Sequence, residues 1–496
     1  MRCLILAAGA ALVLAAAPPA RADTWTWPAY GRDHQLTNDD AASSITTANA
    51  PGMKLAWSDT LDGAIIASPL SARVLIGMSL RQLVFAATEA GSVYGIFADT
   101  GAVVWQRTFP TSAAGACGTF GTSSTGAIDP RRGLLYVAAA DGTIHALSLA
   151  TGAEAAPWPL RLLDRPDVEY VWGGLQLVSG RLYVPVASYC DAPDARGVAA
   201  EGRIDAIDPD NAQVVASWDP VAGFGNLGGV WGWGGVSTAA DETTLYTAVG
   251  NSYVHSDACD CFVDDAGYGD KLVALTPDLT QVLASNKPVD VPTQGDEDFG
   301  AAPLVFQPRG CPPLLAAKNK VGVAYIWNRE RIGDGPIASL GLGDGTSPFV
   351  GAPSYDAALQ TLVVTQVVVA GNGTGYGLAA FGVGASCTFE QRWRTPLGSG
   401  NQAPAIVVGN VVFAGGGDSG GFGALNIANG SLLWSYPTTG RTFSPLIEVG
   451  GTVFGGDLGG TLYAFRAPAL PPPPKAKPRP RRPVRPLHSG PWRLLP

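Results

Sequence analysis

After its first residues the chain contains no uninterrupted apolar stretch of about 20 residues, so no later segment is expected to cross a membrane. No long stretch places apolar residues at i, i+3, i+4 and i+7, which predicts few helices. The motif Cys-x-x-Cys-His is absent, so covalent haem attachment is not expected. Lys is scarce, whereas Gly is abundant and Val, Leu and Thr recur in short runs. This balance favours many short strands joined by turns.

Histidine is also rare, with four in the whole chain. His34, His145 and His255 precede the C-terminal tail, and none belongs to a motif with Ser or Cys, so a nucleophilic triad is not expected. Glycoside hydrolysis is not indicated either, because no carboxylate pair can be nominated by spacing. The net charge is −9 although residues 467–496 are basic, so the rest of the chain is acidic. An acidic body argues against nucleic acid as a partner.

The two ends of the chain differ in composition from the part between them. Arg2, an apolar run over residues 4–17 and small residues before Asp23 are typical of a secretory signal peptide over residues 1–22. We therefore expect an exported protein, periplasmic or secreted, that does not span a membrane. Residues 467–496 are rich in Pro and Arg, which predicts a disordered tail. Such a tail either has no specific role or contacts anionic envelope components.

Six cysteines remain once the predicted signal peptide, which contains Cys3, is removed. An even number in an exported protein favours disulfides, although the pairing cannot be read from the sequence. The close pair Cys259 and Cys261 raises the alternative of a metal bound through sulfur. No second close pair and no nearby His at a zinc-like spacing supports that alternative. The six are Cys117, Cys190, Cys259, Cys261, Cys311 and Cys387.

Between the two ends a short phrase repeats along the chain. A Gly precedes a strand that ends in Ala plus an apolar residue, and a turn and often a Trp follow. This period of about 40 to 70 residues is typical of propeller blades with loop insertions. The sequence therefore predicts one domain over residues 23–466, an all-β, eight-bladed β-propeller with four-stranded blades. The eight copies begin at Gly91, Gly142, Gly202, Asp270, Gly322, Gly377, Gly421 and Gly460.

A propeller must close its ring, because open sheets leave strand edges exposed. Residues 54–57 read as a first strand, and we expect that strand to pair in the last blade, which contains residues 452–465. The recurrent Trp near each turn predicts a large side chain wedged between adjacent blades. The residues concerned are Trp105, Trp158, Trp218, Trp393 and Trp434.

The longest departures from the repeat are residues 190–202 and 250–270. Loops of that size on a rigid scaffold are where function tends to lie. The second is acid-rich, and a hard cation could bind such oxygens. The alternative is a solvated loop tied down by Cys259 or Cys261. Its acids are Asp257, Asp260, Asp264, Asp265 and Asp270.

Motifs in the middle third sharpen this fold prediction into a resemblance. In chain order they are residues 230–233 (Val-Trp-Gly-Trp), 249–251 (Val-Gly-Asn), 295–299 (Gly-Asp-Glu-Asp-Phe) and 317–322 (Ala-Lys-Asn-Lys-Val-Gly), followed by Tyr325 and Arg329. Together with the repeat, which runs from about residue 25 to 466, they resemble the pyrroloquinoline quinone (PQQ) repeats of quinoprotein alcohol dehydrogenases. Members of that family are eight-bladed propellers, and their motifs occur in this order.

The resemblance implies a role for each matching residue. Trp231 would stack on the quinone ring, Lys320 would bond the quinone oxygens, and Asp298 would be the catalytic base. Asn251, Asp298 and Asp191 would be calcium ligands, Asp191 because it lies near the place of a calcium-binding Glu. The chemistry is consistent, since a flat quinone needs an aromatic face and calcium prefers hard oxygen ligands. A carboxylate beside a hydroxyl can also take its proton.

Some features depart from the family, and structural readings of the same residues stay open. Two adjacent cysteines of the family are replaced by Ala-Cys-Gly over residues 116–118, and a cofactor-gripping Arg is not identifiable. Trp231 is also compatible with an inter-blade core position, and Asn251 with a turn after a strand. Asp298 is also compatible with a loop cap or with a structural ion pair to Lys320.

Two function hypotheses follow from these residues. The first is an exported dehydrogenase that depends on PQQ and calcium and oxidises an alcohol or related hydroxyl compound. Its electrons would pass to a separate acceptor, because the chain carries no haem motif. The second is a non-catalytic propeller that acts as an envelope protein-interaction scaffold, as in assembly factors built from the same repeat. The absent cysteine pair favours the scaffold, and the four ordered motifs favour the enzyme.

Overall fold

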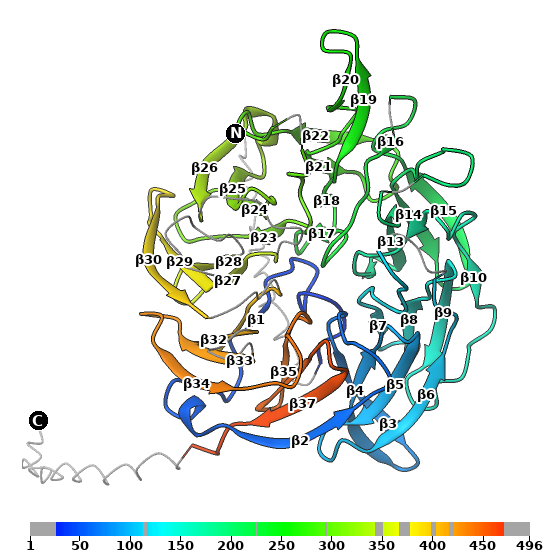
Figure 1. The fold of residues 1–496 in the computed structure, drawn as a ribbon. Helices are drawn as coiled ribbons and strands as arrows, with labels where there is room; N and C mark the ends of the chain where they lie inside the picture. The colour runs from blue at the N-terminus through cyan, green and yellow to red at the C-terminus, as the bar shows by residue number, and fades with distance from the viewer. Residues whose placement is uncertain are drawn as a thin grey trace, which may run out of the picture.

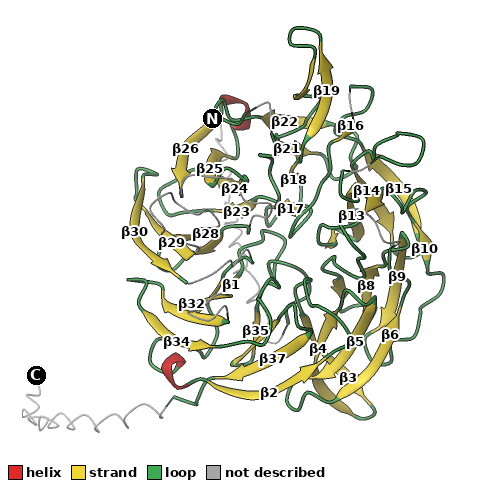
Figure 2. Cartoon of the chain, in the orientation of Figure 1, coloured by secondary structure: helices red, strands yellow, loops and turns green. Residues whose placement is uncertain are grey.

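The computed structural model describes residues 26–112, 117–191, 193–224, 226–292, 295–342, 351–366, 377–397, 403–415 and 421–470. The predicted signal peptide and residues 471–496 of the predicted tail lie outside these ranges. Strands dominate, as the sequence predicts (Figure 2). The helical elements in the described ranges are two single 3-10 turns, Ala50–Gly52 and Ile332–Asp334. None of the helices described there is long and apolar enough to cross a membrane.

Most of the described chain forms four-stranded antiparallel sheets. Each is given in the order in which its strands pair, which for most sheets begins near the middle of the molecule (Figure 1). Two of these sheets come first in the chain, one of β3 (Leu70–Ile76), β4 (Ser79–Ala87), β5 (Ser92–Phe97) and β6 (Val103–Thr108), and one of β7 (Ala127–Asp129), β8 (Leu134–Ala138), β9 (Thr143–Ser148) and β10 (Leu160–Arg161). Three lie in the middle of the chain: β17 (Ser237–Thr238), β18 (Leu245–Ala248), β21 (Leu272–Leu275) and β22 (Val282–Asn286); β23 (Leu304–Phe306), β24 (Leu314–Lys318), β25 (Val323–Asn328) and β26 (Pro336–Gly341); and β27 (Ser354–Asp356), β28 (Thr361–Gln366), β29 (Gly377–Val383) and β30 (Phe389–Pro396). The sixth combines both ends of the described chain, with β35 (Ile447–Val449), β36 (Thr452–Gly456), β37 (Thr461–Arg466) and β2 (Lys54–Thr60).

The remaining sheets vary this plan. One adds a short parallel strand, β1 (Asp39–Asp40), beside β31 (Ile406–Val408), β32 (Val411–Gly415), β33 (Phe422–Asn426) and β34 (Leu432–Tyr436). Another has β12 (Gln176–Val178) and β11 (Glu169–Tyr170) both paired with β13 (Arg181–Ser188), followed by β14 (Arg203–Asp208) and β15 (Gln213–Trp218). A three-stranded sheet combines β16 (Asn226–Leu227), β19 (Ser252–Ser256) and β20 (Cys261–Asp264), and its β19–β20 hairpin projects outward (Figure 1).

The sheets follow one another around a central region, in the manner of propeller blades (Figure 1). Residue type explains the position of each strand within its sheet. Strands near the middle, such as β32, are buried along their whole length, whereas outer strands such as β34 mix exposed and half-buried residues. A strand covered on both faces by neighbouring sheets requires a continuous apolar run, which is what the central strands carry.

The strand predicted at residues 54–57 pairs where the sequence places it. β2 runs antiparallel to β37, with Lys54 opposite Arg466 and Trp57 opposite Ala464. The strand next to the N-terminal lead-in therefore completes the sheet built from the last residues of the described chain. This pairing covers an edge that would otherwise be open to solvent.

The lead-in itself, defined here as residues 26–53, runs across the inner strands of successive sheets. Inner strands turn an edge of unpaired backbone groups toward the middle of the molecule, and such groups need hydrogen-bond partners when buried. The lead-in supplies these partners in chain order. The contacts are Trp27 with Ser71, Pro28 O with Ile128 N, Tyr30 O with the Gln176 amide, His34 O with Thr238 N, Gln35 O with Val305 N, Thr37 O with Tyr355 N, and Asn38 O with Val407 N.

The predicted indole wedges are confirmed. Trp105 donates its ring N–H to the carbonyl of Leu149 in the next sheet at 2.9 Å, and Trp393 does the same to Ile427 at 2.7 Å. In some of these turns a glycine leaves space for the ring, as Gly152 does for Trp105 and Gly430 does for Trp393. A Cβ on Gly152 would lie 2.6 Å from the Trp105 ring, and its φ of +67° also favours glycine. The other members bond or pack at neighbouring sheets: Trp158 to Pro209, Trp218 against Tyr268, and Trp434 against Phe465.

All six cysteines expected in the mature chain form disulfides, as their even number predicts. The pairs are Cys117–Cys190, Cys259–Cys261 and Cys311–Cys387. The suggestion that Cys259 and Cys261 bind a metal through sulfur is therefore not supported.

Because the lead-in is part of the core, we predict that Trp27→Ala destabilises the fold by about 3–5 kcal/mol, the usual cost of truncating a buried aromatic residue. Trp27 is 1% exposed. Phe224→Ala is the matched control, since Phe224 is 68% exposed, and its effect should stay within about 0.5 kcal/mol. Urea denaturation followed by circular dichroism measures both. Equal losses in the two variants would contradict a structural role for the lead-in.

Candidate active site

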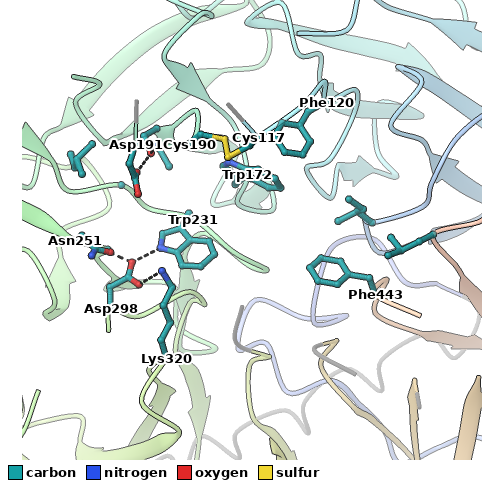
Figure 3. A pocket seen from close by; sticks show the side chains of 17 residues that line it. Cys117, Phe120, Trp172, Cys190, Asp191, Trp231, Asn251, Asp298, Lys320 and Phe443 are labelled. Atoms are coloured by element: carbon teal, nitrogen blue, oxygen red, sulfur yellow. Dashed lines mark hydrogen bonds and ion pairs between the residues drawn. A yellow bond between two sulfur atoms is a disulfide. The ribbon is translucent and has the colours of Figure 1, made fainter. Parts of the chain in front are cut away.

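A cavity of about 520 Å³ lies among loops that connect the sheets, within the size range of small-molecule sites. Polar groups converge at one end of it, where Trp231, Asn251, Asp298 and Lys320 lie together (Figure 3). Aromatic and aliphatic side chains line the remainder, including Phe443 on the far side (Figure 3). All four residues that carry the family resemblance are thus brought to one place by segments far apart in the sequence.

Close backbone packing brings Trp231 and Asp298 together. Trp233 forms a bridge with Ala301, and a Cβ on Gly232 would lie only 1.6 Å from the carbonyl oxygen of Gly300. Glycine at 232, with φ +74°, is therefore a condition of this approach. The result is a direct hydrogen bond in which Trp231 Nε1 donates to Asp298 Oδ2 at 2.7 Å.

Asp298 is the centre of the polar end, and it is 1% exposed. Lys320 Nζ lies 2.7 Å from Asp298 Oδ1, and Lys320 N donates to the Asp298 carbonyl at 2.9 Å. The Lys320 ammonium also pairs with Asp296 and lies 4.6 Å from the centre of the Trp231 ring. One cation therefore faces two carboxylates and an aromatic ring, so its position is strongly defined.

Burial shifts the acid–base properties of this pair. It raises the pKa of Asp298 to about 7, because removal from water disfavours the anion and the nearby Lys320 offsets this only in part. For Lys320, burial alone would lower the pKa. The Asp298 charge and the hydrogen bonds to both carboxylates outweigh burial and raise the pKa of Lys320 above its usual range. At neutral pH the ammonium is therefore charged, and Asp298 is close to its midpoint.

Asn251 completes the polar end and is 6% exposed. Its backbone N–H donates to Asp298 Oδ2 at 3.2 Å, and its side-chain amide lies within hydrogen-bonding distance, 2.9 Å, of Tyr253 Oη. Gly250 makes this approach possible, because a Cβ there would lie 2.7 Å from Asp298 Oδ2. Asn251 therefore contacts Asp298 through its backbone and faces it with its side chain (Figure 3).

The Asn251 side chain bears on whether a cation fits here. With the amide turned so that both of its ends are satisfied, its nitrogen donates to Asp298 Oδ2 at 2.8 Å and its oxygen accepts from the Tyr253 hydroxyl at 2.9 Å. Amide and carboxylate oxygens are also the hard ligands that calcium prefers, and rotation of the Asn251 amide would present its oxygen to a cation beside Asp298. Asn251 and Asp298 therefore fit a calcium ion as a partial ligand set. Within the described ranges, no group of three or more His, Cys, Asp or Glu is arranged to hold a metal.

Asp191 lines the same cavity but does not contact Asn251 or Asp298. Its carboxylate accepts a hydrogen bond from the Ser188 hydroxyl, and its own N–H donates to Ser188 Oγ at 3.1 Å. Asp191 lies beside the Cys117–Cys190 disulfide, at the edge of the polar end (Figure 3). The three residues expected to ligate calcium thus share one cavity, with two of them in direct contact.

The acid-rich segment over residues 250–270 divides into two parts. Asp257 and Asp260 are exposed beside His255, as in a solvated loop. Asp264 and Asp270 are instead buried behind the polar end with Lys287, which lies 3.1 Å from Asp270. Asp264 accepts the Ser252 N–H, and Asp270 N donates to Gly250 O at 3.3 Å. These two carboxyls therefore support the backbone on both sides of Asn251.

Burial also raises the pKa of both carboxyls in this second pair. The charge of Asp264 adds to the rise at Asp270, whereas the Ser252 N–H and a hydrogen bond with Asp270 offset part of the rise at Asp264, and Lys287 offsets part of both. The charge of Asp270 in turn contributes to the raised pKa of Asp298. The polar end of the cavity and the carboxyl pair behind it are thus electrostatically coupled.

The walls of the cavity contain residues that the sequence analysis did not nominate. Trp172 and Phe120 lie beside the disulfide, and Ile66, Phe443 and Leu458 form an apolar wall away from Asp298. One signal for Trp172 was available. Residues 171–173 read Val-Trp-Gly, the same phrase as residues 230–232 one repeat later. Nothing local marks the others, because each belongs to a different loop and their proximity depends on the ring of sheets.

Comparisons with known proteins agree with this architecture. A family model for PQQ repeats, described as outer membrane protein assembly factor BamB, matches residues 41–217 and 383–468. Polyvinylalcohol dehydrogenase of Sphingopyxis sp. (strain 113P3) is 24% identical over 492 residues, covering 88% of this chain and 70% of that protein.

Solved structures extend the same likeness. A quinohemoprotein alcohol dehydrogenase from Pseudomonas putida HK5 aligns with a TM-score of 0.71 and 14% identity, over 92% of this chain and 82% of that one. The quinohemoprotein alcohol dehydrogenase of Comamonas testosteroni gives 0.69 and 17%, over 90% and 81%. At these identities the two structures establish a shared fold.

The pKa of about 7 for Asp298 predicts a titration that is visible without any cofactor. As the pH falls through about 7, Asp298 takes up a proton and the hydrogen bond from Trp231 Nε1 weakens, so the Trp231 indole ¹⁵N–¹H resonance should move. Trp327 is the internal control, because its indole donates to the neutral amide of Asn286 at 2.9 Å. Spectra from pH 5 to 9, assigned with Trp231→Phe, test this. The transition should vanish in Asp298→Asn, and a stationary Trp231 signal in the wild type would contradict it.

Proposed function

The chain belongs to the PQQ-repeat family whose model describes outer membrane protein assembly factor BamB, and we propose that it is an exported dehydrogenase that uses PQQ and calcium to oxidise an alcohol. The observation that carries this proposal is the buried Asp298, which contacts Trp231, Asn251 and Lys320 at one end of a cavity of about 520 Å³. A purely structural blade has no need for a carboxylate, an ammonium and an indole gathered at a cavity wall.

Trp231 and Lys320 are the residues suited to hold the quinone. When bound, PQQ would supply a two-electron acceptor for the hydride of the alcohol. Trp231 offers a ring face along the slot, and the Lys320 ammonium is held against that ring and against Asp298. A fixed cation near the quinone oxygens stabilises negative charge that develops there, at no cost of reorientation during the reaction.

Asp298 is suited to act as the general base. A base works best when its pKa is near the working pH, and burial brings the pKa of Asp298 to about 7. The Trp231 indole and the Asn251 N–H each bond Oδ2, which fixes the orientation of the carboxylate toward the cavity. A substrate hydroxyl placed beside it would lose its proton to Asp298 while its C–H hydride leaves.

Asn251 and Asp298 are the residues that would hold the calcium ion, and Asp191 is a third candidate at the edge of the same cavity. Bound there, the cation would act as a Lewis acid on the reacting carbonyl. The Asn251 amide lies beside the Asp298 carboxylate, and both groups carry the hard oxygens that calcium prefers, which supports this assignment. Oxygens of the quinone and water would complete the shell.

An alcohol substrate is supported by the nature of the cavity and by the relatives. Away from Asp298 the wall is apolar, which suits an uncharged molecule with one hydroxyl directed at the base. Polyvinylalcohol dehydrogenase is one such relative, and the two structural neighbours are named alcohol dehydrogenases. Because Cys-x-x-Cys-His is absent, the electrons would pass to a separate acceptor.

The same proposal covers the number of blades, the closure of the ring and the location of the protein. We propose a single domain over residues 23–466 with eight blades, in which the pairing of β2 with β37 closes the ring. Residues 1–22 would direct export to the periplasm or the medium. The tail over residues 467–496 would stay outside the propeller, where its positive charge is suited to anionic envelope components.

A second candidate is a non-catalytic scaffold for envelope proteins. The matching family model favours it, because that model is described as an outer membrane protein assembly factor. The two candidates differ in one property that can be tested directly. A scaffold has no reason to bind PQQ in the cavity, whereas the dehydrogenase must.

We predict that Asp298→Asn lowers the rate of PQQ-dependent dye reduction at least about 10²-fold, because loss of a general base usually costs 10²- to 10⁴-fold. The assay uses purified protein with PQQ and calcium, an artificial dye and a panel of alcohols. In the wild type the rate should rise with pH until Asp298 is ionised, since only its carboxylate accepts a proton, and bound calcium should place this rise below the pH of about 7 that applies to the site without a cation.

Asp257→Asn is the control, because Asp257 is exposed and does not line the cavity. Its rate should match that of the wild type, and circular dichroism should show that both variants are folded. A wild-type protein that neither binds PQQ nor reduces dye with calcium present would refute the dehydrogenase and leave the scaffold.

A further inference from the structure

One wall of the cavity contains a disulfide that the proposed chemistry does not use. Cys117 follows β6, and Cys190 follows β13 in a different sheet, so the bond joins two segments 73 residues apart in the sequence. Both cysteines line the cavity (Figure 3). The other disulfides, Cys259–Cys261 and Cys311–Cys387, contribute no residue to that lining.

The segment that carries Cys190 is held in an unfavourable conformation. Cys190 has φ +63° and Asp191 has φ +53°, two successive residues in the left-handed region. L-residues with a Cβ rarely adopt this region, and runs of it are rarer still. A conformation of this kind persists only when the surroundings impose it.

Non-covalent contacts also hold this turn, since Ser188 pairs with Glu169 of β11 and Tyr189 packs against Phe120 and Tyr170. The Tyr189 hydroxyl bonds the carbonyl of Gly118, next to Cys117, and Tyr189 N donates to Val168 O at 2.6 Å. Asp191 N donates to Ser188 Oγ within the turn. The one covalent restraint is the disulfide, and it acts on the first of the two left-handed residues.

We propose that the Cys117–Cys190 disulfide is the positioning latch of the cavity, and that the slot for the cofactor forms fully only when this bond is oxidised. The bond fixes Asp191 at the polar end and holds the segment that leads to Phe120 against the turn at residues 188–191. Without it, the turn relaxes out of the left-handed region and Asp191 leaves its place. The part that concerns the cofactor rests on the proposed function.

The disulfide latch also determines in which cellular compartment the cofactor site can form. In a reducing compartment the two thiols would remain free and the cavity would stay open. Oxidation after export would complete the site, so the protein would acquire its cofactor only outside the cytosol. Cys117 is exposed, which leaves its sulfur accessible to a small thiol.

Reduction of the latch is a balanced exchange. A thiolate of a dithiol reductant attacks one sulfur of the Cys117–Cys190 bond and forms a mixed disulfide, with the other cysteine as the leaving thiolate. The second thiol of the reductant then displaces the first cysteine and closes a cyclic disulfide. The dithiol loses two electrons, and the protein gains two electrons and two protons as two thiols.

The test compares two double variants, Cys117→Ser with Cys190→Ser and Cys311→Ser with Cys387→Ser. The second pair is a matched control, because it spans 76 residues against 73 and so constrains the unfolded chain to a similar extent. Both variants should therefore lose similar stability in urea. The first readout is the dissociation constant of PQQ in the presence of calcium, from quenching of tryptophan fluorescence. The second is amide hydrogen exchange over residues 188–191 without cofactor.

We expect the Cys117/Cys190 variant to bind PQQ about 10- to 100-fold more weakly, as when a supporting partner of a site is lost, and to exchange faster over residues 188–191. The Cys311/Cys387 variant should match the wild type in both readouts. Equal weakening in the two variants, or unchanged exchange in the first, would overturn the latch. If the wild type fails to bind PQQ while exchange rises only in the first variant, the proposed function fails and the latch stands.

Discussion

The inner strands of the sheets meet around one centre, and each turns an unpaired edge toward it. The lead-in satisfies these edges one after another, from Ser71 in the first inner strand to Val407 near the end of the chain. Its side chains then form part of the cavity support. Tyr30 and Leu36 pack with Trp233, Ala301 and Ala302, which directly follow the segments that carry Trp231 and Asp298. The lead-in, which pairs with the inner strands, therefore also fixes the distance between the Trp231 indole and the Asp298 carboxylate.

Burying charge at the polar end of the cavity costs free energy, and two successive ion pairs offset part of that cost. Asp298 and Lys320 neutralise each other beside Trp231, and behind them Asp270 lies against Lys287. Buried ion pairs of this kind contribute little to stability compared with apolar packing. Their presence is better explained by function, because they hold a carboxylate with a pKa of about 7 at one end of a cavity whose far wall is apolar.

The scaffold and the site obey different rules. Indole wedges such as Trp105 and Trp393 recur in sheet after sheet, since every blade interface poses the same packing problem. The cavity residues do not recur in this way, and they come from loops whose lengths vary between repeats. A PQQ-repeat propeller can therefore serve as an enzyme or as an assembly factor without a change of fold, and the loops decide which.

The sequence by itself determined the repeated strand phrase, the indole wedges, the pairing of residues 54–57 with the last sheet and the order of the four motifs. These features are local or periodic, so a linear pattern can encode them. Only the tertiary structure decided that Cys117 bonds Cys190, that Asp264 and Asp270 are buried behind Asn251, and that Phe443 faces the cavity. The physical reason is that these contacts join loops of different sheets. Their proximity follows from the way the sheets pack around the central region. No short stretch of sequence encodes that packing.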